Sequence, residues 1–555
     1  MEVTLRCRVD NGLCTMRHVC LWPGAGVGSV ANMNSLSPVP VRADWKTSLE
    51  ETINEFFDPI QEKFAEIIFY PITLGDIEVP FVVIWLVLAG IIVTLYTVFI
   101  QFRGLPTALN VVRGKYSTES DPGEITHFQA LSSALSGTVG LGNIAGVGVA
   151  VAVGGPGATF WMIICGLLGM ATKFAECTLG VKYREVREDG TVDGGPFKYL
   201  PVAYGKIHPV VGTLMTGLFA ISILFFGAAG GNMFQSNQTY AQMKSVTGGD
   251  DGFLGGAGAS LFFGLALAVI VGLVIMGGIK SIGKVTEKLV PAMGLLYLVA
   301  CLVVIVVNID HVPDAATRIV TDAFNPEGVA GGVIGTLIVG FQRAAFSNEA
   351  GLGSAPIAHS AVKTRRPVSE GFVALLEPLA DTVIICTMTA LTIIIADTPE
   401  YNESIANATD DDPATEALDG VLVTSNAFET VIPWFPYVLA VAVALFAIST
   451  QITWAYYAMR AWAYLFGDSR ASMFAIKAIY LFFTVMGAVL TLTAVMNFAD
   501  SWLFLCAFVN LLGVYLLLPV IKQEMKEYLA DRKAGRLDIL GEDDREGATR
   551  MTVGS

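Results

Sequence analysis

The chain has 555 residues, of which 54% are hydrophobic and only 15% are charged. Soluble domains carry about 25% charged residues, so this composition excludes a soluble globular protein, a disordered chain and a coiled coil. The formal net charge of −15 argues against nucleic acid as a partner. The 8 cysteines include no CxxC pair, so we expect no disulfide framework and no zinc site. The composition predicts an all-α polytopic membrane protein whose surroundings are the lipid bilayer.

In chain order, residues 1–43 have no periodic apolar pattern and predict an irregular N-terminal tail. Residues 44–80 contain an amphipathic stretch, which predicts a segment that lies on the membrane surface. Eleven apolar stretches follow, and each is close to the roughly 20 residues that a membrane-spanning helix needs. They are 81–101, 127–153, 158–181, 210–239, 258–279, 288–308, 329–358, 371–396, 434–459, 474–493 and 499–520. We name the first the accessory helix and the others core helices one to ten.

The distribution of Lys and Arg predicts the topology. If the connector after the accessory helix is cytoplasmic, the cytoplasmic connectors and the tail 521–555 carry 23 basic residues, against 2 in the outward connectors. The positive-inside rule then places the N-terminus outside and the C-terminus in the cytoplasm. The outward stretch 397–429 holds nine acidic residues and no basic one. It is either a solvated acidic surface or a vestibule that collects cations.

Two segments depart from ordinary membrane helix. Residues 136–143 in core helix one read SGTVGLGN, and residues 346–356 in core helix six read FSNEAGLGSAP. Each places Gly-Leu-Gly among polar residues at mid-membrane depth, where irregular backbone survives only if it lines a cavity inside the protein. Close helix packing through small residues is the alternative explanation for either segment alone.

The positions of these segments predict two inverted repeats, 127–308 and 329–520, because each contains five core helices. Corresponding broken helices in inverted halves are the best sequence pointer to a transporter's binding site. The N-terminus of a half-helix suits a carboxylate, and the carbonyls at the opposing C-terminus suit an ammonium group or a cation. We therefore expect a transporter for a zwitterionic amino acid and a small cation. An ion channel is a weaker alternative, and without an HExxH or GxSxG motif we expect no enzyme.

The residues also carry a resemblance. The stretches TVGLGNIAGV, GGPGATFWM, FAECTLG, GGPFKYL and FQRAAFSNEAGLGSAPIAHSA resemble the alanine or glycine:cation symporter family, over about residues 50–530. The resemblance implies a LeuT-type five-plus-five inverted repeat with one extra N-terminal helix. It also implies that sodium drives uptake of alanine or glycine by alternating access. Independently of the resemblance, we expect a monomer in the cell membrane. In some members of the family the coupling ion is a proton.

The resemblance further implies the substrate-binding residues, which lie in the two breaks and on two neighbouring helices. They are Thr138, Gly140, Leu141, Gly142, Asn143, Gln235, Phe346, Ser347, Asn348 and Trp454. The amides of the first break would bind the substrate carboxylate, and Phe346 would cover the apolar side of the pocket. Trp454 would shorten the pocket so that it favours a small side chain; without the resemblance, it would be interpreted as a packing aromatic.

For sodium, the resemblance implies a site between core helices one and eight. The hydroxyls of Ser449 and Thr450 would meet carbonyls near Ser136 and Val139, with no carboxylate in the shell. A Ser-Thr pair in a membrane helix more often bonds back to its own helix, and that is the alternative. Apart from this coupling ion, we expect no cofactor.

Ionisable residues inside membrane helices are functional candidates by default. Arg343 and Glu349 flank the second break and are the candidates for gates. Two further pairs either hold helices together or form gates: Lys173 with Glu176, whose spacing on one helix allows them to pair with each other, and Glu377 with Asp381. For His127 and His359, which lie at predicted cytoplasmic helix ends, we expect no ligand role.

Overall fold

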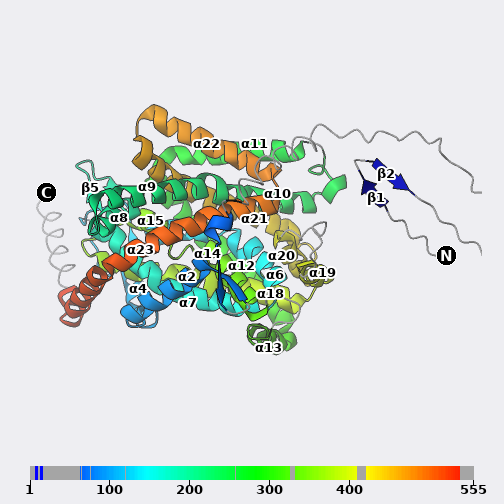
Figure 1. Cartoon of the computed structure of the whole chain (residues 1–555), viewed down its shortest axis with the longest axis horizontal. Coiled ribbons are helices and arrows are strands. Elements are labelled where there is room, and N and C mark those ends of the chain that lie inside the picture. Colours follow the sequence, from blue (N-terminus) through cyan, green and yellow to red (C-terminus); the bar gives the residue numbers. More distant parts are fainter. Residues whose placement is uncertain are drawn as a thin grey trace, which may run out of the picture. The chain divides into compact units, whose positions relative to one another are not determined.

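The computed structural model describes residues 7–10, 13–16, 63, 65–74, 77–118, 120–256, 258–325, 332–408 and 420–537. It divides into two units, Met1–Thr52 and Ile53–Ser555. In the first unit, β1 (Cys7–Asp10) and β2 (Leu13–Met16) pair as an antiparallel hairpin within the tail predicted to be irregular. The second unit is a bundle of helices (Figure 1).

The second unit begins with a short hairpin followed by an apolar helix. Strands β3 (Pro71–Leu74) and β4 (Ile77–Pro80) pair antiparallel, where the sequence predicted part of a surface segment. Much of that segment, 44–62, lies outside the described residues. The accessory helix is α2 (Phe81–Tyr96), which is followed by the short helices α3 (Ile100–Arg103) and α4 (Leu105–Val112).

The first predicted repeat, 127–308, is helical apart from short connections. Its elements are α5 (His127–Thr138), η1 (Gly142–Gly146), α6 (Val147–Gly154), α7 (Gly157–Lys182), β5 (Glu185–Val186), β6 (Val192–Asp193), α8 (Pro196–Gly205), α9 (Pro209–Phe225), η2 (Phe226–Gly231), α10 (Asn232–Val246), η3 (Gly249–Asp251), α11 (Ala259–Val274), η4 (Ile275–Gly277) and α12 (Gly278–Val307). The connection to the second repeat contains η5 (Ile309–His311) and α13 (Val312–Asp322).

The second predicted repeat, 329–520, is also helical over its described residues. Its elements are α14 (Gly332–Asn348), α15 (Ala355–His359), α16 (Pro367–Ala374), α17 (Leu376–Pro378), η6 (Leu379–Cys386), α18 (Thr387–Ala396), α19 (Pro399–Ala408), α20 (Gly420–Glu429), α21 (Phe435–Phe466), α22 (Arg470–Val489) and α23 (Leu492–Lys533). Helix α23 runs well past the predicted span 499–520, so the start of the predicted cytoplasmic tail continues the last core helix.

Seven helices in the described part of the chain are long and apolar enough to cross a membrane, or eight if the bent pair α5 and η1–α6 forms one span. Helices α2 and α11 are apolar but shorter. Each of the eleven predicted stretches overlaps a helical segment over its described residues. The structure therefore confirms a mostly helical protein with several apolar spans, and the number eleven stays a prediction.

Helix α7 packs against α14, α16 and α2. Small residues allow the close approach: a Cβ atom added to Gly340 on α14 would lie 2.7 Å from the carbonyl oxygen of Ala158 on α7. Glycine-mediated contacts of this kind are typical of helices packed in a membrane, where van der Waals contact drives association.

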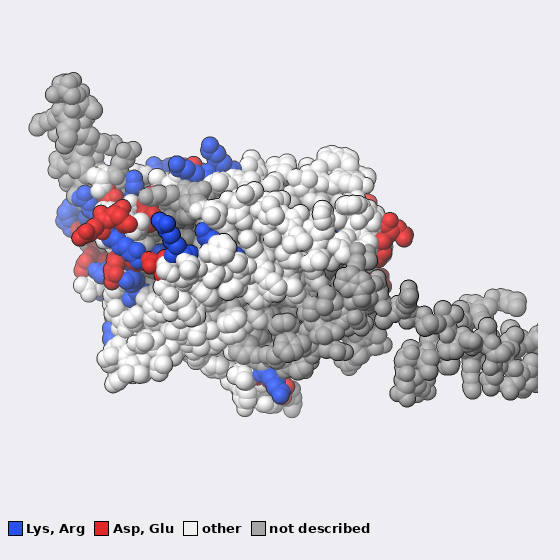
Figure 2. All heavy atoms as spheres, turned by 90° about the horizontal axis from the view of Figure 1, so that it is seen from above, with Lys and Arg blue, Asp and Glu red and all other residues white. Residues whose placement is uncertain are grey.

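Charged side chains gather at one end of the bundle (Figure 2). Several of them form ion pairs, including Lys182 with Glu524 (2.5 Å) and Lys198 with Glu185 (2.5 Å). These residues lie at the end of α7, around β5 and α8, and on α23, which are segments predicted to be cytoplasmic. Between this end and the opposite end, Figure 2 shows a surface almost free of charge, as expected of a face that contacts lipid.

Candidate functional site

The first break interrupts the helix formed by α5 and η1–α6, whose two parts are bent by 52°. Two amides in the break are bound by side-chain oxygens. The Gly140 amide donates to Asn143 Oδ1 (2.9 Å), and the Leu141 amide donates to Gln235 Oε1 (3.3 Å) from α10. The structure therefore places Gln235, which the resemblance put in the wall of the pocket, at the first break. A substrate carboxylate could accept hydrogen bonds from the same two amides.

The second break lies between α14 and α15. Glu349, Gly351 and Gly353 have φ angles of 56°, 94° and 81°, which lie in the left-handed region that only glycine adopts readily. The freed amides find acceptors inside the protein. The Ala350 amide donates to Asn348 Oδ1 (2.9 Å), and those of Gly351 (3.2 Å) and Gly353 (2.9 Å) donate to the carboxylate of Glu176 on α7.

Asp381 on η6 joins the two breaks. Its carboxylate accepts hydrogen bonds from Asn143 Nδ2 (2.6 Å) in the first break, from Ser347 Oγ (2.9 Å) in the second, and from Thr382 Oγ1 (2.7 Å). Asp381 is fully buried, and among the described residues it has no Lys, Arg or His as an ion-pair partner. A buried carboxylate surrounded by neutral donors is costly unless a cation compensates it.

The role of Asp381 was missing from the sequence-based site, in which it was expected to act with Glu377. Those two carboxylates are separated in function, because Glu377 bonds to Lys173 (3.0 Å) and His359 (2.5 Å). The sequence signal that could have identified Asp381 is a carboxylate inside a membrane helix, because such a residue is a functional candidate by default. The helix itself is π-helical at η6, a distortion that is frequent at functional sites.

The proposed sodium ligands lie at the contact between α5 and α21. Ser136 Oγ lies 2.6 Å from Ser449 Oγ and donates to the Ser449 carbonyl (2.9 Å), and Thr453 Oγ1 donates to Ser136 Oγ (3.0 Å). The hydroxyl of Thr450 is buried and has no hydrogen-bond partner in the described part of the chain. Ser136 thus meets Ser449 through its hydroxyl, whereas the resemblance implied its carbonyl. Val139, at the end of α5, is buried in extended backbone (ψ 93°).

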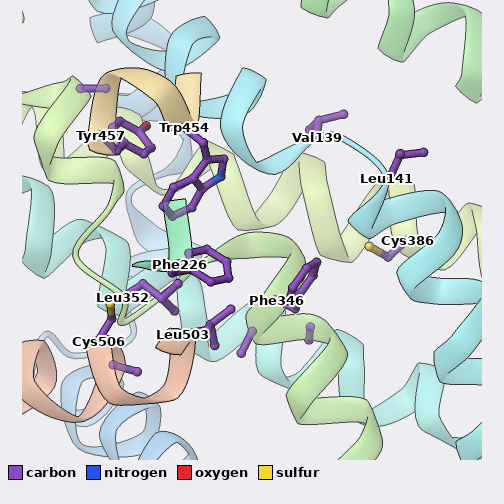
Figure 3. Packing of buried hydrophobic residues seen from close by; sticks show 14 of the residues in the cluster. Val139, Leu141, Phe226, Phe346, Leu352, Cys386, Trp454, Tyr457, Leu503 and Cys506 are labelled. Carbon is purple, nitrogen blue, oxygen red and sulfur yellow. The ribbon is translucent and has the colours of Figure 1, made fainter. Parts of the chain in front are cut away.

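An aromatic wall bounds the site on its apolar side, as Figure 3 shows. Phe346 packs edge-on against Phe234 (5.0 Å between ring centroids) and Phe226 (6.1 Å). Trp454 packs edge-on against Phe226 (4.6 Å) and Tyr457 (5.2 Å). Both Phe346 and Trp454 are buried, so together they restrict the space beside the breaks.

Both gate candidates have definite partners. Glu349 accepts hydrogen bonds from Trp454 Nε1 (3.0 Å) and from Ser354 Oγ (2.5 Å), so it connects the second break to the aromatic wall. Arg343 forms an ion pair with Asp500 on α23, a residue that sequence reasoning missed, and its guanidinium lies 5.6 Å from the centre of the Phe346 ring.

Lys173 and Glu176, whose spacing allows a pair, bond to other partners instead. Lys173 bonds to Glu377 on α17, and Glu176 binds the amides of the second break and Asn510 Nδ2. Spacing along one helix permits a pair, but partners on neighbouring helices compete for the same charges. Of the other predicted residues, Asn348 donates through Nδ2 to Thr382 Oγ1 (2.9 Å), and Thr138 is the last residue of α5.

A likeness to a solved structure agrees with this architecture. The chain matches the structure of MhsT in complex with L-phenylalanine with a TM-score of 0.50 at 15% identity, over 70% of this chain and 88% of that one. At this identity the likeness shows the fold alone. It confirms a LeuT-like fold, whereas the division into two five-helix repeats stays a prediction.

Sequence comparisons identify the family. The pattern of the sodium:alanine symporter family matches residues 69–540. The chain is 37% identical to the sodium/alanine symporter AgcS of Methanococcus maripaludis, over 82% of this chain and 95% of that protein. It is 33% identical to the probable sodium/glutamine symporter GlnT of Bacillus subtilis (82% and 89%) and 32% identical to the amino-acid carrier protein AlsT of the same organism (83% and 93%). These relatives are transporters, and the chain accordingly belongs to the sodium:alanine symporter family and is a membrane transporter rather than an enzyme.

Proposed function

We propose that this protein is a sodium-coupled symporter that carries small neutral amino acids, alanine and glycine, into the cell. The observation that carries the proposal is the buried carboxylate of Asp381, which neutral donors hold between the two broken helices. Such a carboxylate is stabilised by a cation, and both the ammonium group of an amino acid and a sodium ion meet that requirement.

The substrate carboxylate would take the place of side-chain oxygens at the first break. The amides of Gly140 and Leu141 now donate to Asn143 and Gln235. A carboxylate can accept the same hydrogen bonds, and they strengthen when the acceptor is charged. Close packing limits the size of the substrate: a Cβ atom on Gly142 would lie 3.3 Å from the Cα atom of Ser347.

Oxygen ligands for the coupling ion are available where α5 and α21 meet. The hydroxyls of Ser136, Ser449 and Thr450 gather between α5 and α21, and no described residue forms a hydrogen bond with the Thr450 hydroxyl. Oxygen atoms are the ligands that hard cations prefer. Because each set of ligands comes from different helices, the ion would hold these helices together. Substrate and ion would then raise each other's affinity, as linkage requires.

A proton is the second candidate for the coupling ion. Protonation of Asp381 would neutralise the same buried charge that sodium or an ammonium group would compensate. The names of the relatives favour sodium, since those of AgcS and GlnT both specify a sodium symporter. Among the described residues, no repeated ring of carbonyl or charged groups resembles a channel filter.

The decisive measurement is uptake of labelled alanine into proteoliposomes under separate sodium and proton gradients. We expect saturable uptake driven by sodium and little response to a proton gradient alone. Asp381→Asn should abolish stimulation by sodium while the amount of protein in the membrane stays similar, because the buried anion is lost. The matched control is Asp314→Asn, which changes an exposed carboxylate on α13. Uptake driven equally well by protons would contradict sodium coupling.

The hydroxyl site is tested in the same assay. Ser449→Ala combined with Thr450→Val removes two hydroxyls without adding charge. We expect the sodium concentration for half-maximal uptake to rise at least about tenfold, which corresponds to roughly 1.4 kcal/mol of lost ion binding. Unchanged sodium dependence in this double variant would exclude the site between α5 and α21.

A further inference from the structure

A continuous chain of buried ionisable side chains lies away from the proposed substrate site. It runs from His127 on α5 through Glu370 on α16, His359 on α15 and Glu377 on α17 to Lys173 on α7. The contacts of His359 with the two carboxylates are both 2.5 Å, and Lys173 lies 3.0 Å from Glu377. All five side chains are at most 2% exposed. Buried charges of this kind in membrane helices are expensive and therefore functional candidates.

The hydrogen bonds determine the charge of each member. With Glu370 and Glu377 ionised, both carboxylates only accept hydrogen bonds, so both ring nitrogens of His359 donate and His359 is an imidazolium. His127 contacts Glu370 through Nδ1, while its buried Nε2 has no partner among the described residues, as expected of a neutral imidazole. The two positive charges of Lys173 and His359 thus balance the two negative charges of Glu370 and Glu377.

Cys177 on α7 lies beside the same groups, and its sulfur, His359 and Glu377 could meet around a metal ion. The contacts oppose that use. Both nitrogens of His359 are engaged by carboxylates, and the ammonium group of Lys173 faces Glu377, where it would repel a cation. The cluster is therefore better described as a set of ion pairs than as a metal site.

These five ionisable side chains join the segments that must separate if the bundle opens at its predicted cytoplasmic end. Helices α5 and α15 are halves of the two broken helices, and both begin or end in connectors predicted to be cytoplasmic. Their ends also bond to each other, because the Lys363 amide donates to the Ile125 carbonyl (2.7 Å). Arg184, just beyond α7, donates to the carbonyls of Ser360 (2.7 Å) and Pro122 (2.8 Å) and so links the same two ends.

We propose that this charge-balanced chain is the latch that holds the cytoplasmic end of the transporter closed, and that His359 is its central positioning residue. The inference rests on the proposed transport function, since alternating access requires an inner gate. Movement of α5 breaks the contact between His127 and Glu370, and movement of α15 withdraws the imidazolium from both carboxylates. The carboxylates then lack partners until water reaches them, which opposes opening.

The test is hydrogen–deuterium exchange of the full-length protein in lipid nanodiscs, without substrate. His359→Gln leaves two carboxylates against one ammonium group. We expect exchange over 127–138 and 355–364 to become at least about tenfold faster, because breaking a buried ion pair strongly destabilises the closed state. His359→Gln combined with Glu370→Gln restores the balance of one positive and one negative charge, and should return exchange most of the way to that of the parent. His311→Gln, an exposed histidine, is the matched control.

A purely steric role for His359 would make the double variant at least as open as the single one, and that result would overturn the proposal. Unchanged exchange in His359→Gln would overturn it as well. If His359→Gln does not fold, His127→Gln provides the test. We expect its exchange to be faster than that of the parent over 127–138 but not over 355–364. The same change in exchange rate in both segments contradicts the latch. Exchange requires no transported substrate, so failure of alanine uptake in the parent would reject the proposed function without deciding the latch.

Discussion

At the scale of single residues, Trp454 and Glu349 show how the structure links roles that the sequence assigned separately. The indole Nε1 of Trp454 donates to Glu349 (3.0 Å), and its ring packs against Phe226. A wall residue and a gate candidate are therefore parts of one contact. Movement of the second break would disturb the aromatic wall, so the proposed pocket and the proposed gate would be coupled through this contact.

Gly140 occupies the most crowded position of the first break. A Cβ atom there would lie 2.4 Å from Thr450 Oγ1 and 3.4 Å from Gln235 Oε1. We predict that Gly140→Ala displaces the Thr450 hydroxyl and raises the sodium concentration for half-maximal uptake at least about tenfold, since misplacement of site groups by even 1 Å can be that costly.

The matched control for this prediction is Gly217→Ala on α9, where an added Cβ meets no atom within 4 Å. It should leave uptake and its sodium dependence unchanged. If Gly140→Ala behaves like Gly217→Ala in titrations of uptake against sodium, then the close approach of Thr450 to the break has no part in ion binding.

At the scale of elements, the second break depends on a support from another helix. Glu176 on α7 accepts the amides of Gly351 and Gly353 together with Asn510 Nδ2. Unpaired backbone amides are not tolerated at membrane depth, so a partner for them is essential. A residue that sequence reasoning expected in a side-chain ion pair thus holds the backbone of the site.

We predict that Glu176→Gln weakens this support, because the Gln side chain has one carbonyl oxygen and its amide nitrogen cannot accept. At least one donor would lose its acceptor, and hydrogen bonds to charged groups contribute about 1.5–3 kcal/mol each. The melting temperature of the detergent-solubilised protein should fall by several degrees and uptake should be lost. Glu185→Gln, at a side chain that is 68% exposed, should change neither. A Glu176→Gln variant with the parent's melting temperature would show that the break supports itself.

At the scale of the whole second unit, charge is segregated along the bundle. Basic side chains gather at the end that holds β5, α8 and the end of α23, while the central surface is almost uncharged (Figures 1 and 2). This arrangement agrees with the asymmetry of 23 and 2 basic residues in the sequence. The orientation itself, with the C-terminus in the cytoplasm, stays a prediction.

Cysteine labelling of intact cells checks the orientation. Glu403→Cys on α19 should react with an impermeant maleimide from outside, whereas Lys533→Cys at the end of α23 should react only after permeabilisation; both side chains are exposed. The background should carry serine at Cys7, Cys14 and Cys20, because the other five cysteines are buried. The reverse labelling pattern would invert the topology.

Much of the architecture could be predicted from the sequence because it depends on local properties. Apolar length predicted the helices, since a bilayer needs a fixed span. Glycine among polar residues predicted both breaks, and their motifs predicted the family, which the comparisons confirm. The hairpin of β3 and β4 was missed because its few residues carry a weak pattern.

The partners of the charged and polar side chains were decided only by the tertiary structure. Asp381, Asp500 and Glu176 acquire their roles from groups on other helices, namely Ser347, Arg343 and the amides of the second break. Residues spaced three or four apart on one helix are neighbours whatever the fold, so the sequence predicts such pairs directly. Inside a bundle, a buried charge must find a compensating group to offset its loss of water, and that group belongs to whichever helix lies opposite. Which helices face one another is a property of the packed chain, and no local pattern contains it.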